Sequence, residues 1–110
     1  MAYDEHLANR LRDLLVDEDG ITEKKMFGGL AFLLNGHLCV SASHNGGLLV
    51  RLAPADSDAA LRRQHVALMQ MGGRAMEGWI TVAPEGLKTR RQLADWVKRG
   101  ASYARTLPPK

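Results

Sequence analysis

The sequence predicts an α+β domain in which an antiparallel meander sheet is flanked by an amino-terminal helix, a short middle helix and a long carboxyl-terminal helix. Two observations carry this prediction. Residues 26–52 read MFGGLAFLLNGHLCVSASHNGGLLVRL, in which two turn signals, Asn35-Gly36 and 43–47, separate apolar segments. Stretches with the helical spacing of apolar residues lie before and after this run. The expected order is α-β-β-β-β-α-β-α, and a length of 110 residues predicts a single domain over residues 1–110.

The first expected helix spans residues 4–17, with Asp4 as its N-cap. Its apolar residues recur at helical spacing and predict one buried face, formed by Leu7, Leu11, Leu14 and Leu15. Three acidic residues, 17–19, lie where the negative end of the helix dipole would be, and Gly20 follows them. We therefore expect this helix to fray or to turn early.

Four consecutive strands follow, over residues 22–27, 30–34, 37–42 and 48–53. Lys24 and Lys25 mark the first strand as partly exposed and a candidate edge. Gly28-Gly29 predicts a bulge or sharp bend; backbone contact with an anion is the alternative, although no Lys-Ser or Lys-Thr follows as in a phosphate loop. Asn35-Gly36 predicts a two-residue type I′ turn, because both positions require φ above zero.

This turn predicts the register of the central hairpin. Opposed pairs would be Leu34 with His37, Leu33 with Leu38, Phe32 with Cys39, and Ala31 with Val40. One face would then carry Ala31, Leu33, Leu38 and Val40, and the other Phe32, Leu34, His37 and Cys39. Neither face is polar, so we expect helices on both faces or a partner chain on one. The second alternative predicts a homodimer formed through the sheet.

The segment after the meander starts with PADSD at 54–58, a helix-start signal that leads into a short helix over 59–65. Leu61 of this helix is expected to point inward. Three methionines around Gly72-Gly73 are expected to fill gaps in the core, with an adaptable binding surface as the alternative; they are Met69, Met71 and Met76. Glu77-Gly78 suits a turn before the last expected strand, Trp79–Ala83.

The final helix is predicted to start at the capping box Thr89 to Gln92 and to run to about Leu107. Its packing stripe comprises Leu93, Trp96, Val97, Gly100, Ala101, Ala104 and Leu107. Glycine in the middle of a helix lowers stability by about 1 kcal/mol relative to alanine. Gly100 therefore predicts a close approach between this helix and a neighbouring element.

Composition limits the function classes. The net charge is +3, but residues 1–55 hold 5 basic and 7 acidic side chains, whereas residues 56–110 hold 10 basic and 5 acidic. Such asymmetry is compatible with a polyanionic partner and also with plain solvated helix faces. One cysteine permits no internal disulfide, and no signal peptide or membrane-spanning run is visible, so we expect a cytoplasmic protein without membrane contact.

No catalytic, metal-binding or cofactor-binding residues are predicted. His37 and Cys39 could form half of a zinc site, but His6, His44 and His65 are scattered over other elements. The same Cys-His pair has no third group to orient it as a nucleophile. Ser41, Ser43 and His44 likewise lack an acid partner and a nucleophile-elbow motif. We expect a protein that is not an enzyme.

The basic side chains around the last helix are the candidate contacts for a partner or for nucleic acid: Lys88, Arg90, Arg91, Lys98 and Arg99. Arginines at a helix amino terminus oppose the dipole, so helix stability does not explain them. They could pair with Glu85 or Asp95, contact phosphates, or meet an acidic protein surface. The aromatic residues look structural, and neither a base-stacking platform nor a helix-turn-helix pattern is evident.

The segments MFGG, NGHL, GGLLVRL, GRAMEGWITV and WVKRGASYARTLPPK together resemble the amino-terminal domain of the TfoX/Sxy family over essentially the whole chain. Full-length members are bacterial regulators of natural competence, thought to act with the cyclic-AMP receptor protein. The resemblance implies a regulatory or protein-interaction module of α+β fold, and it brings no catalytic residues. Longer members also carry a carboxyl-terminal domain that this sequence lacks, so we expect a stand-alone short form.

Two functional hypotheses remain. In the first, the domain binds a protein partner such as RNA polymerase or a transcription factor, or a second copy of itself. In the second, the basic residues contact nucleic acid directly. A continuous basic stripe on the folded surface would favour nucleic acid, whereas interspersed acids would favour protein or solvent.

Overall fold

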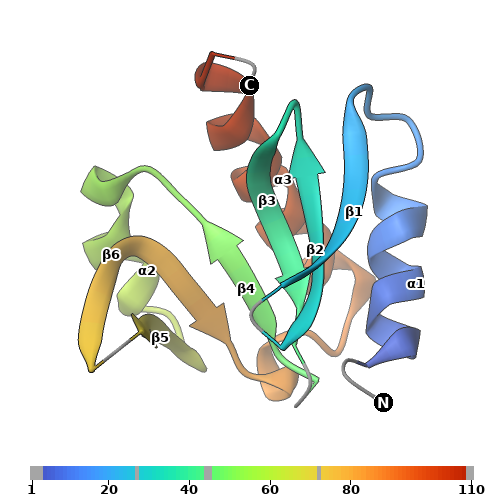
Figure 1. Ribbon diagram of the computed structural model, residues 1–110. Coiled ribbons are helices and arrows are strands. Elements are labelled where there is room, and N and C mark those ends of the chain that lie inside the picture. The colour runs from blue at the N-terminus through green and yellow to red at the C-terminus, as the bar shows by residue number, and fades with distance from the viewer. Residues whose placement is uncertain (1–3, 27, 44–45, 72, 109–110) are drawn as a thin grey trace.

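The computed structural model describes residues 4–26, 28–43, 46–71 and 73–108, which form one antiparallel sheet with helices on one side (Figure 1). The helices are α1 (Glu5–Leu14), the 3-10 turn η1 (Pro54–Asp56), α2 (Ser57–Leu61), the 3-10 turn η2 (Pro84–Gly86) and α3 (Arg90–Thr106). The strands are β1 (Ile21–Met26), β2 (Gly29–Leu34), β3 (His37–Ala42), β4 (Leu48–Arg51), β5 (Val66–Met71) and β6 (Arg74–Val82). The predicted α+β class is confirmed, with one strand, β5, that the predicted order lacks.

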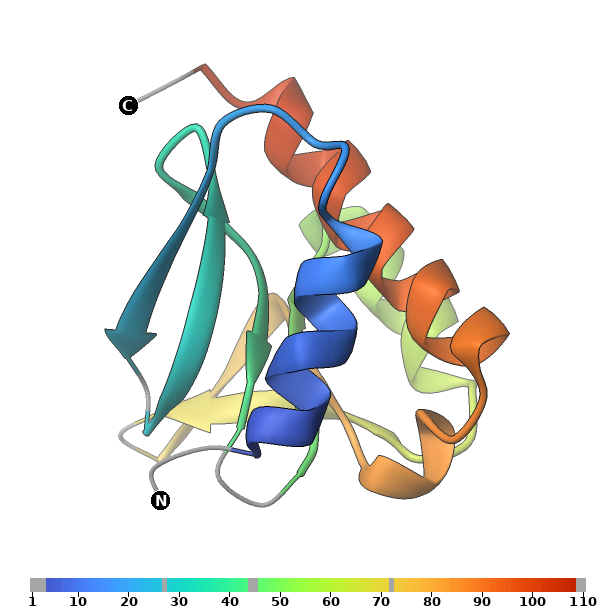
Figure 2. The same ribbon diagram turned by 90° about the vertical axis from the view of Figure 1, so that its right-hand side faces the viewer.

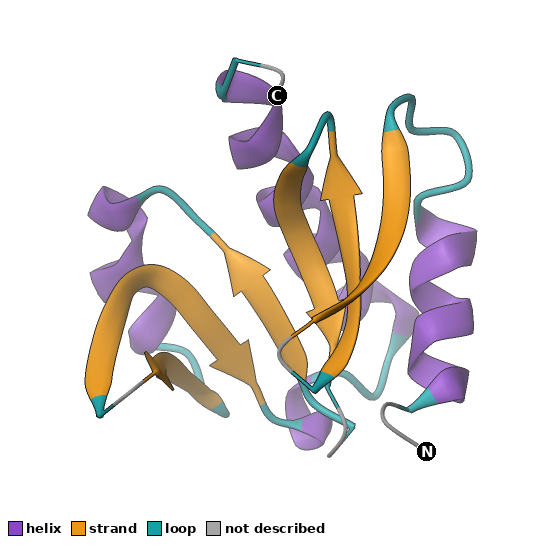
Figure 3. Ribbon diagram, viewed as in Figure 1, coloured by secondary structure: helices purple, strands orange, loops and turns teal. Residues whose placement is uncertain are grey.

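The sheet and the helices form two layers. The strand order is β1-β2-β3-β4-β6-β5, and Figures 2 and 3 show the α-helices gathered on one side of the sheet. The core lies between them, and its largest fully buried side chains include Trp96, Phe32, Leu11, Leu34, Leu48 and Ile80. The predicted buried faces of the first and last helices are confirmed at Leu7, Leu11, Leu15, Leu93, Trp96, Val97, Gly100, Ala101 and Ala104.

The first helix begins where predicted and ends earlier. The backbone N–H of Leu7 donates to Asp4 Oδ1 at 3.1 Å, which confirms the N-cap. The helix ends at Leu14, before the acidic residues 17–19. Gly20, with φ of +80°, lies directly before β1 and its carbonyl accepts from the N–H of Asn35 at 3.0 Å. Gly20 is therefore the residue that leads into β1, and it does not cap α1.

The glycine pair between β1 and β2 builds a tight hairpin. Gly28 has φ of +73°, and Met26 pairs with Gly29 across the turn. A Cβ atom at Gly29 would lie 2.1 Å from the carbonyl oxygen of Ala42, so only glycine fits against β3 here. The predicted bend is confirmed. Phe27, the last residue of the predicted first strand, lies outside the described residues.

The central hairpin has the predicted turn and a different register. Asn35 and Gly36 have φ of +52° and +86°, as a type I′ turn requires. The two pairs nearest the turn are those predicted, but a β-bulge follows, so Phe32 faces Val40 instead of Cys39. Ala31 faces Ser41 instead of Val40. The predicted register is therefore wrong beyond the bulge, because an extra residue turns Val40 to the helix side of the sheet.

The second face of the sheet has no helix over it within the described residues. Its centre is nevertheless buried, at Ala31, Leu38 and Leu49, and partly buried Met26, Leu33, Met69 and Trp79 surround that centre. Figures 1 and 2 show the β5–β6 hairpin crossing the sheet end at a steep angle to β1–β3. Met69 and Trp79 of this hairpin thus provide part of the cover that we expected from helices or a partner chain.

The segment from residue 57 to residue 82 differs most from prediction. The middle helix is α2, Ser57–Leu61, and not 59–65; its continuation is replaced by a turn in which His65 has φ of +69°. The methionine-rich segment is an antiparallel hairpin in which Met69 and Met76 oppose each other and are only half-buried. Gly78, with φ of +82°, is a bulge inside β6, where a separate turn was expected.

Candidate functional site

The long helix α3 has a capped amino terminus and packs closely against the sheet at its middle. Thr89 Oγ1 accepts from the N–H of Gln92 at 3.1 Å, and the Gln92 side chain accepts from the N–H of Thr89 at 3.0 Å, which confirms the capping box. In the middle, a Cβ at Gly100 would lie only 2.6 Å from the Cys39 carbonyl oxygen. The predicted close approach is confirmed, and the outer face of α3 is held in a defined position.

The predicted basic residues fall into two groups on this face. Lys88, Arg90 and Arg91 lie at the amino-terminal end, near α1. Arg90 Nη1 donates to Asp13 Oδ2 at 2.8 Å, so this arginine pairs with neither Glu85 nor Asp95, the predicted acids. Lys88 and Arg91 are exposed and make no ion pair with any other residue that the structure describes.

The second group, Lys98 and Arg99, lies half-way along the helix. Asp95 Oδ2 accepts from Arg99 Nε at 3.1 Å and from Arg63 Nη1 at 2.8 Å, so one carboxylate joins α3 to the loop before β5. The hydrogen bond from Arg63, and then that from Arg99, holds the pKa of Asp95 below its ordinary value despite partial burial. Both guanidinium groups also lie near the Trp96 ring. The guanidinium carbon is 4.4 Å from the ring centre in Arg63 and 5.7 Å in Arg99.

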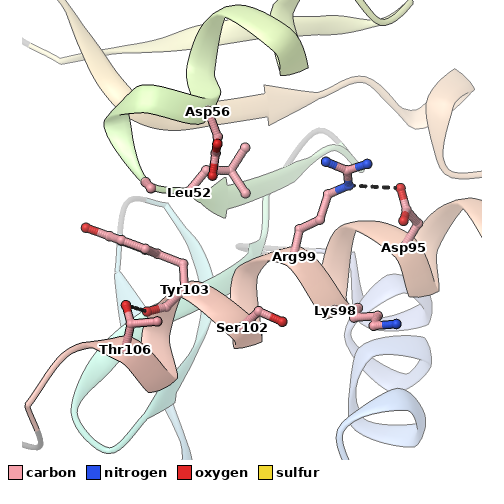
Figure 4. Close-up of a pocket in the computed structure, with 9 residues that line it drawn as sticks. Leu52, Asp56, Asp95, Lys98, Arg99, Ser102, Tyr103 and Thr106 are labelled. Atoms are coloured by element: carbon pink, nitrogen blue, oxygen red, sulfur yellow. Dashed lines mark hydrogen bonds and ion pairs between the residues drawn. The ribbon is translucent and has the colours of Figure 1, made fainter.

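A groove of about 570 Å³ runs between α3 and the segment that leaves β4 (Figure 4). Its lining residues are Leu52, Ala53, Asp56, Asp95, Lys98, Arg99, Ser102, Tyr103 and Thr106. Figure 4 shows Arg99 and Tyr103 extending from α3 on the side that faces Leu52 and Asp56, with the Arg99 guanidinium turned toward Asp95. The groove therefore combines an apolar floor, an aromatic ring and charges of both signs.

The ring of Tyr103, which forms one wall of this groove, is held in place by the guanidinium group of Arg51. The Arg51 guanidinium carbon lies 5.6 Å from the Tyr103 ring centre and 5.1 Å from that of Trp79. Cation–π contacts of this kind stabilise by roughly 0.5–1 kcal/mol at exposed sites. Arg51 thus connects the end of β4 to α3 and limits the motion of the Tyr103 ring.

Acidic side chains interrupt the basic surface of α3 along its length. Arg90 pairs with Asp13, Arg99 with Asp95, and Arg105 with Glu18. A duplex or single strand would have to compete with these carboxylates for each of the three arginines. The folded surface is therefore interspersed with acids and is not a continuous basic stripe.

The comparison with protein families gives one match that covers most of the chain. The family model described as the TfoX N-terminal domain matches residues 13–104. The chain belongs to the TfoX N-terminal domain family. It is therefore a module of the competence-regulator type. The search of curated proteins finds no match to this chain.

Many of the residues on which the family resemblance rests have structural roles in this TfoX N-terminal domain. Gly28 and Gly29 shape the first hairpin, and Gly100 lets α3 approach β3. Trp96 fills the core beneath two arginines. Tyr103 differs, because its ring is half-buried and lines the groove. Of the two aromatic residues Trp96 and Tyr103, Tyr103 is the one whose ring is open to a partner in the groove.

The histidine and cysteine candidates do not come together in the TfoX N-terminal domain. His37 lies at a half-buried position and its Nε2–H donates to the carbonyl oxygen of Pro108 at 2.6 Å. Burial of Cys39, followed by the nearby charge of Glu18, raises the pKa of its thiol to about 12. Within the described ranges no three His, Cys, Asp or Glu side chains are grouped as a metal site requires, and His44 lies outside those ranges.

Sequence reasoning missed two residues that line the groove, Asp56 and Tyr103, and also Arg51, which contacts the Tyr103 ring. Asp56 was interpreted as a helix cap, yet its side chain makes no capping hydrogen bond and instead lines the groove. Tyr103 was assigned to the structural aromatics. The signal available in the sequence was the spacing of four between Arg99 and Tyr103, which places both on one helix face. None of the helices in the described part of this TfoX N-terminal domain has the length and hydropathy of a membrane span.

Proposed function

We propose that this TfoX N-terminal domain is a non-enzymatic regulatory module that binds a protein of the transcription machinery in the groove between α3 and the end of β4. The observation that carries the proposal is the pairing of the α3 arginines with carboxylates, which leaves a surface of mixed charge. Family membership supports the regulatory role.

The types of residue that line the groove favour a protein partner. Arginine and tyrosine are enriched at the energetically dominant positions of protein interfaces, and both face Leu52 across the groove. Arg99 is held by Asp95 and Tyr103 by Arg51, so their side chains have little freedom left to lose on binding. Such a rigid pair suits the insertion of an apolar side chain between them and Leu52.

The charges on the two walls of the groove also favour a protein partner. Lys98 is exposed and makes no ion pair with another described residue, and the carboxylate of Asp56 is similarly unpaired on the opposite wall. Charges of opposite sign on two walls favour a partner segment that carries both signs, whereas Asp56 would repel a polyanion. We therefore propose a protein segment with an apolar side chain between an acidic and a basic one.

The test uses purified proteins of the class that the family suggests, RNA polymerase and the cyclic-AMP receptor protein. The domain is immobilised and binding is measured for wild type, Tyr103→Ala, Arg99→Glu and the control Arg91→Glu. We expect one of the two proteins to bind, with at least a tenfold loss, about 1.4 kcal/mol, in both groove variants and little change in the control. Absence of binding by both proteins, or equal loss in the control, would contradict the proposal.

Direct nucleic-acid binding is the second candidate function. It rests on Lys88 and Arg91, which are exposed and unpaired among the described residues at the amino-terminal end of α3. Fluorescence anisotropy of a labelled duplex at about 50 and 200 mM salt tests it, because phosphate contacts weaken steeply over this range. Micromolar affinity that falls with salt and is lost in Arg91→Glu would favour this alternative over a protein partner.

A further inference from the structure

The two edges of the sheet differ in chemistry. The edge strand β1 carries Glu23, Lys24 and Lys25, and Glu23 is bound by both Nε and Nη2 of Arg12 at 2.8 Å. Charged side chains of this kind discourage pairing with another strand. The opposite edge strand, β5, reads VALMQM and contains no charged residue and no proline. Only β5 therefore lacks the usual protection of an edge.

The backbone of β5 presents hydrogen-bonding groups to its open side. The N–H of Ala83 donates to the carbonyl of His65 at 2.8 Å, and Thr81 Oγ1 donates to the carbonyl of Ala67 at 3.4 Å. Backbone polar groups alternate in direction along an antiparallel strand, so those of Val66 and Leu68 point away from β6. These groups are free to form a ladder with an added strand.

The side chains of β5 are incompletely buried on both faces of the sheet. Val66 and Leu68 pack partly against the main core, and Met69 packs partly against the cluster on the opposite face. A docked helix would cover one of these faces. A strand added at the edge would extend the sheet and cover both, so the pattern of partial burial fits strand addition.

We propose that β5 is a homodimerisation edge, at which the β5 strands of two copies pair antiparallel about a two-fold axis and join their sheets. The absence of charged side chains from β5 favours a second copy of the chain as the partner. Two-fold pairing places a strand opposite itself, and β5 has no charge to repel its own copy. The same pairing through β1 would bring Lys24 and Lys25 of both copies together.

The size of this contact predicts a weak dimer. A six-residue strand spans about 20 Å, so the interface lies at the small end of specific protein contacts. We expect dissociation constants of roughly 10–100 µM, with a monomer dominant at low concentration. This proposal is independent of the groove, since β5 and the residues that line the groove do not overlap.

Sedimentation equilibrium from about 5 to 500 µM measures the association. The variant Ala67→Lys places a charge at an exposed β5 position, and Thr22→Lys places the same charge at an exposed position of β1. We expect wild type and Thr22→Lys to dimerise alike and Ala67→Lys to dissociate at least tenfold more readily, with unchanged circular dichroism. A monomer over the whole range, or equal association of both variants, would overturn the proposal.

Amide hydrogen exchange locates the contact at residue level. In a monomer the outward amides of Val66 and Leu68 have no acceptor and exchange fast, whereas in the proposed dimer they are protected. We expect protection at these two amides to rise with protein concentration while that of Thr22 stays constant. Dimerisation without added protection at Val66 and Leu68 would place the contact elsewhere and would also overturn the proposal.

Discussion

Gly100 of α3 lies directly against the carbonyl group of Cys39 in β3, so close that a methyl group would fall 2.6 Å from the oxygen and 3.3 Å from Val40 Cγ1. This contact sets the distance between the long helix and the centre of the sheet. Because the groove is bounded by the same helix, the position of its wall depends on a glycine on the opposite face of α3.

Gly100→Ala should destabilise the protein although alanine favours helix. The gain in helix propensity is about 1 kcal/mol, whereas forcing a methyl group into a filled site costs about 1–3 kcal/mol and must here displace backbone. Urea unfolding measures the net change. Ser102→Ala, on the exposed side of the same helix, is the control and should be neutral or slightly stabilising. Stability of Gly100→Ala equal to or above that of wild type would show that the contact can relax.

Gly73 and Gly78 provide a matched pair, with φ of +81° and +82°. A Cβ at Gly73 meets no atom within 4 Å, whereas one at Gly78 would lie 2.6 Å from the Leu52 carbonyl. Gly73→Ala should therefore cost about 1–2 kcal/mol from conformation alone, and Gly78→Ala clearly more. Thermal unfolding of both variants measures the difference. Equal losses would mean that the β4–β6 contact is not tight.

Asp95→Asn should weaken the link between α3 and the loop before β5. The carboxylate is partly exposed and screened, so we expect a loss of about 1 kcal/mol or less at neutral pH and low salt. The folded-state pKa of Asp95 is lowered, first by the hydrogen bond from Arg63. Its contribution is thus complete above the unfolded-state pKa of about 3.9 and disappears as pH falls through the folded-state pKa.

Urea unfolding of Asp95→Asn and wild type at several pH values between about 7 and 2 checks this dependence. Asp13→Asn is the matched control, because its single ion pair with Arg90 is more exposed. The difference in unfolding free energy between Asp95→Asn and wild type should begin to close below about pH 4 and vanish below the folded-state pKa. Asp13→Asn should differ less from wild type at every pH. A difference that persists in acid would assign the effect of Asp95 to packing instead of charge.

The thiol of Cys39 should be inert in the folded protein. Burial raises its pKa to about 12, so the thiolate is essentially absent at pH 8 and reagents cannot reach it. Labelling with a thiol reagent should follow the rate of unfolding and become fast in denaturant. Since the unfolded thiol ionises near pH 8.5, wild type should also lose stability relative to Cys39→Ala as pH rises toward 12. Rapid labelling of the native protein would contradict this assignment.

Local sequence signals predicted the turns and caps of this fold. Asn35-Gly36, Thr89 and Asp4 each act through neighbours a few residues away, so their roles are visible in the chain itself. The bulge between the Leu33–Leu38 and Phe32–Val40 pairs was not visible, because it depends on how β3 packs against the distant helix α3. Strand β5 was also missed. Its sequence, VALMQM, does not alternate apolar and polar residues, so it lacks the usual signal of a strand that is buried on one face.

The sequence predicted which basic residues lie at the candidate site, but it did not predict which residues they contact. The sequence indicated that Arg90 lies at the start of the last helix and Arg99 further along its polar side, and in the structure both are exposed at these places. It could not indicate that Arg90 meets Asp13, which is 77 residues away. Neither could it place Asp56 across from Tyr103, since that relationship depends on the path of the chain after β4.

We propose that the groove beside α3, and not the basic amino-terminal end of that helix, receives the partner. Amide chemical-shift mapping of the labelled domain, titrated separately with the cyclic-AMP receptor protein, RNA polymerase and a DNA duplex, tests it in one experiment. We expect shifts or line broadening centred on Leu52, Arg99 and Tyr103 with one of the two proteins and none with the duplex. Changes confined to Lys88, Arg90 and Arg91, produced by the duplex, would contradict it.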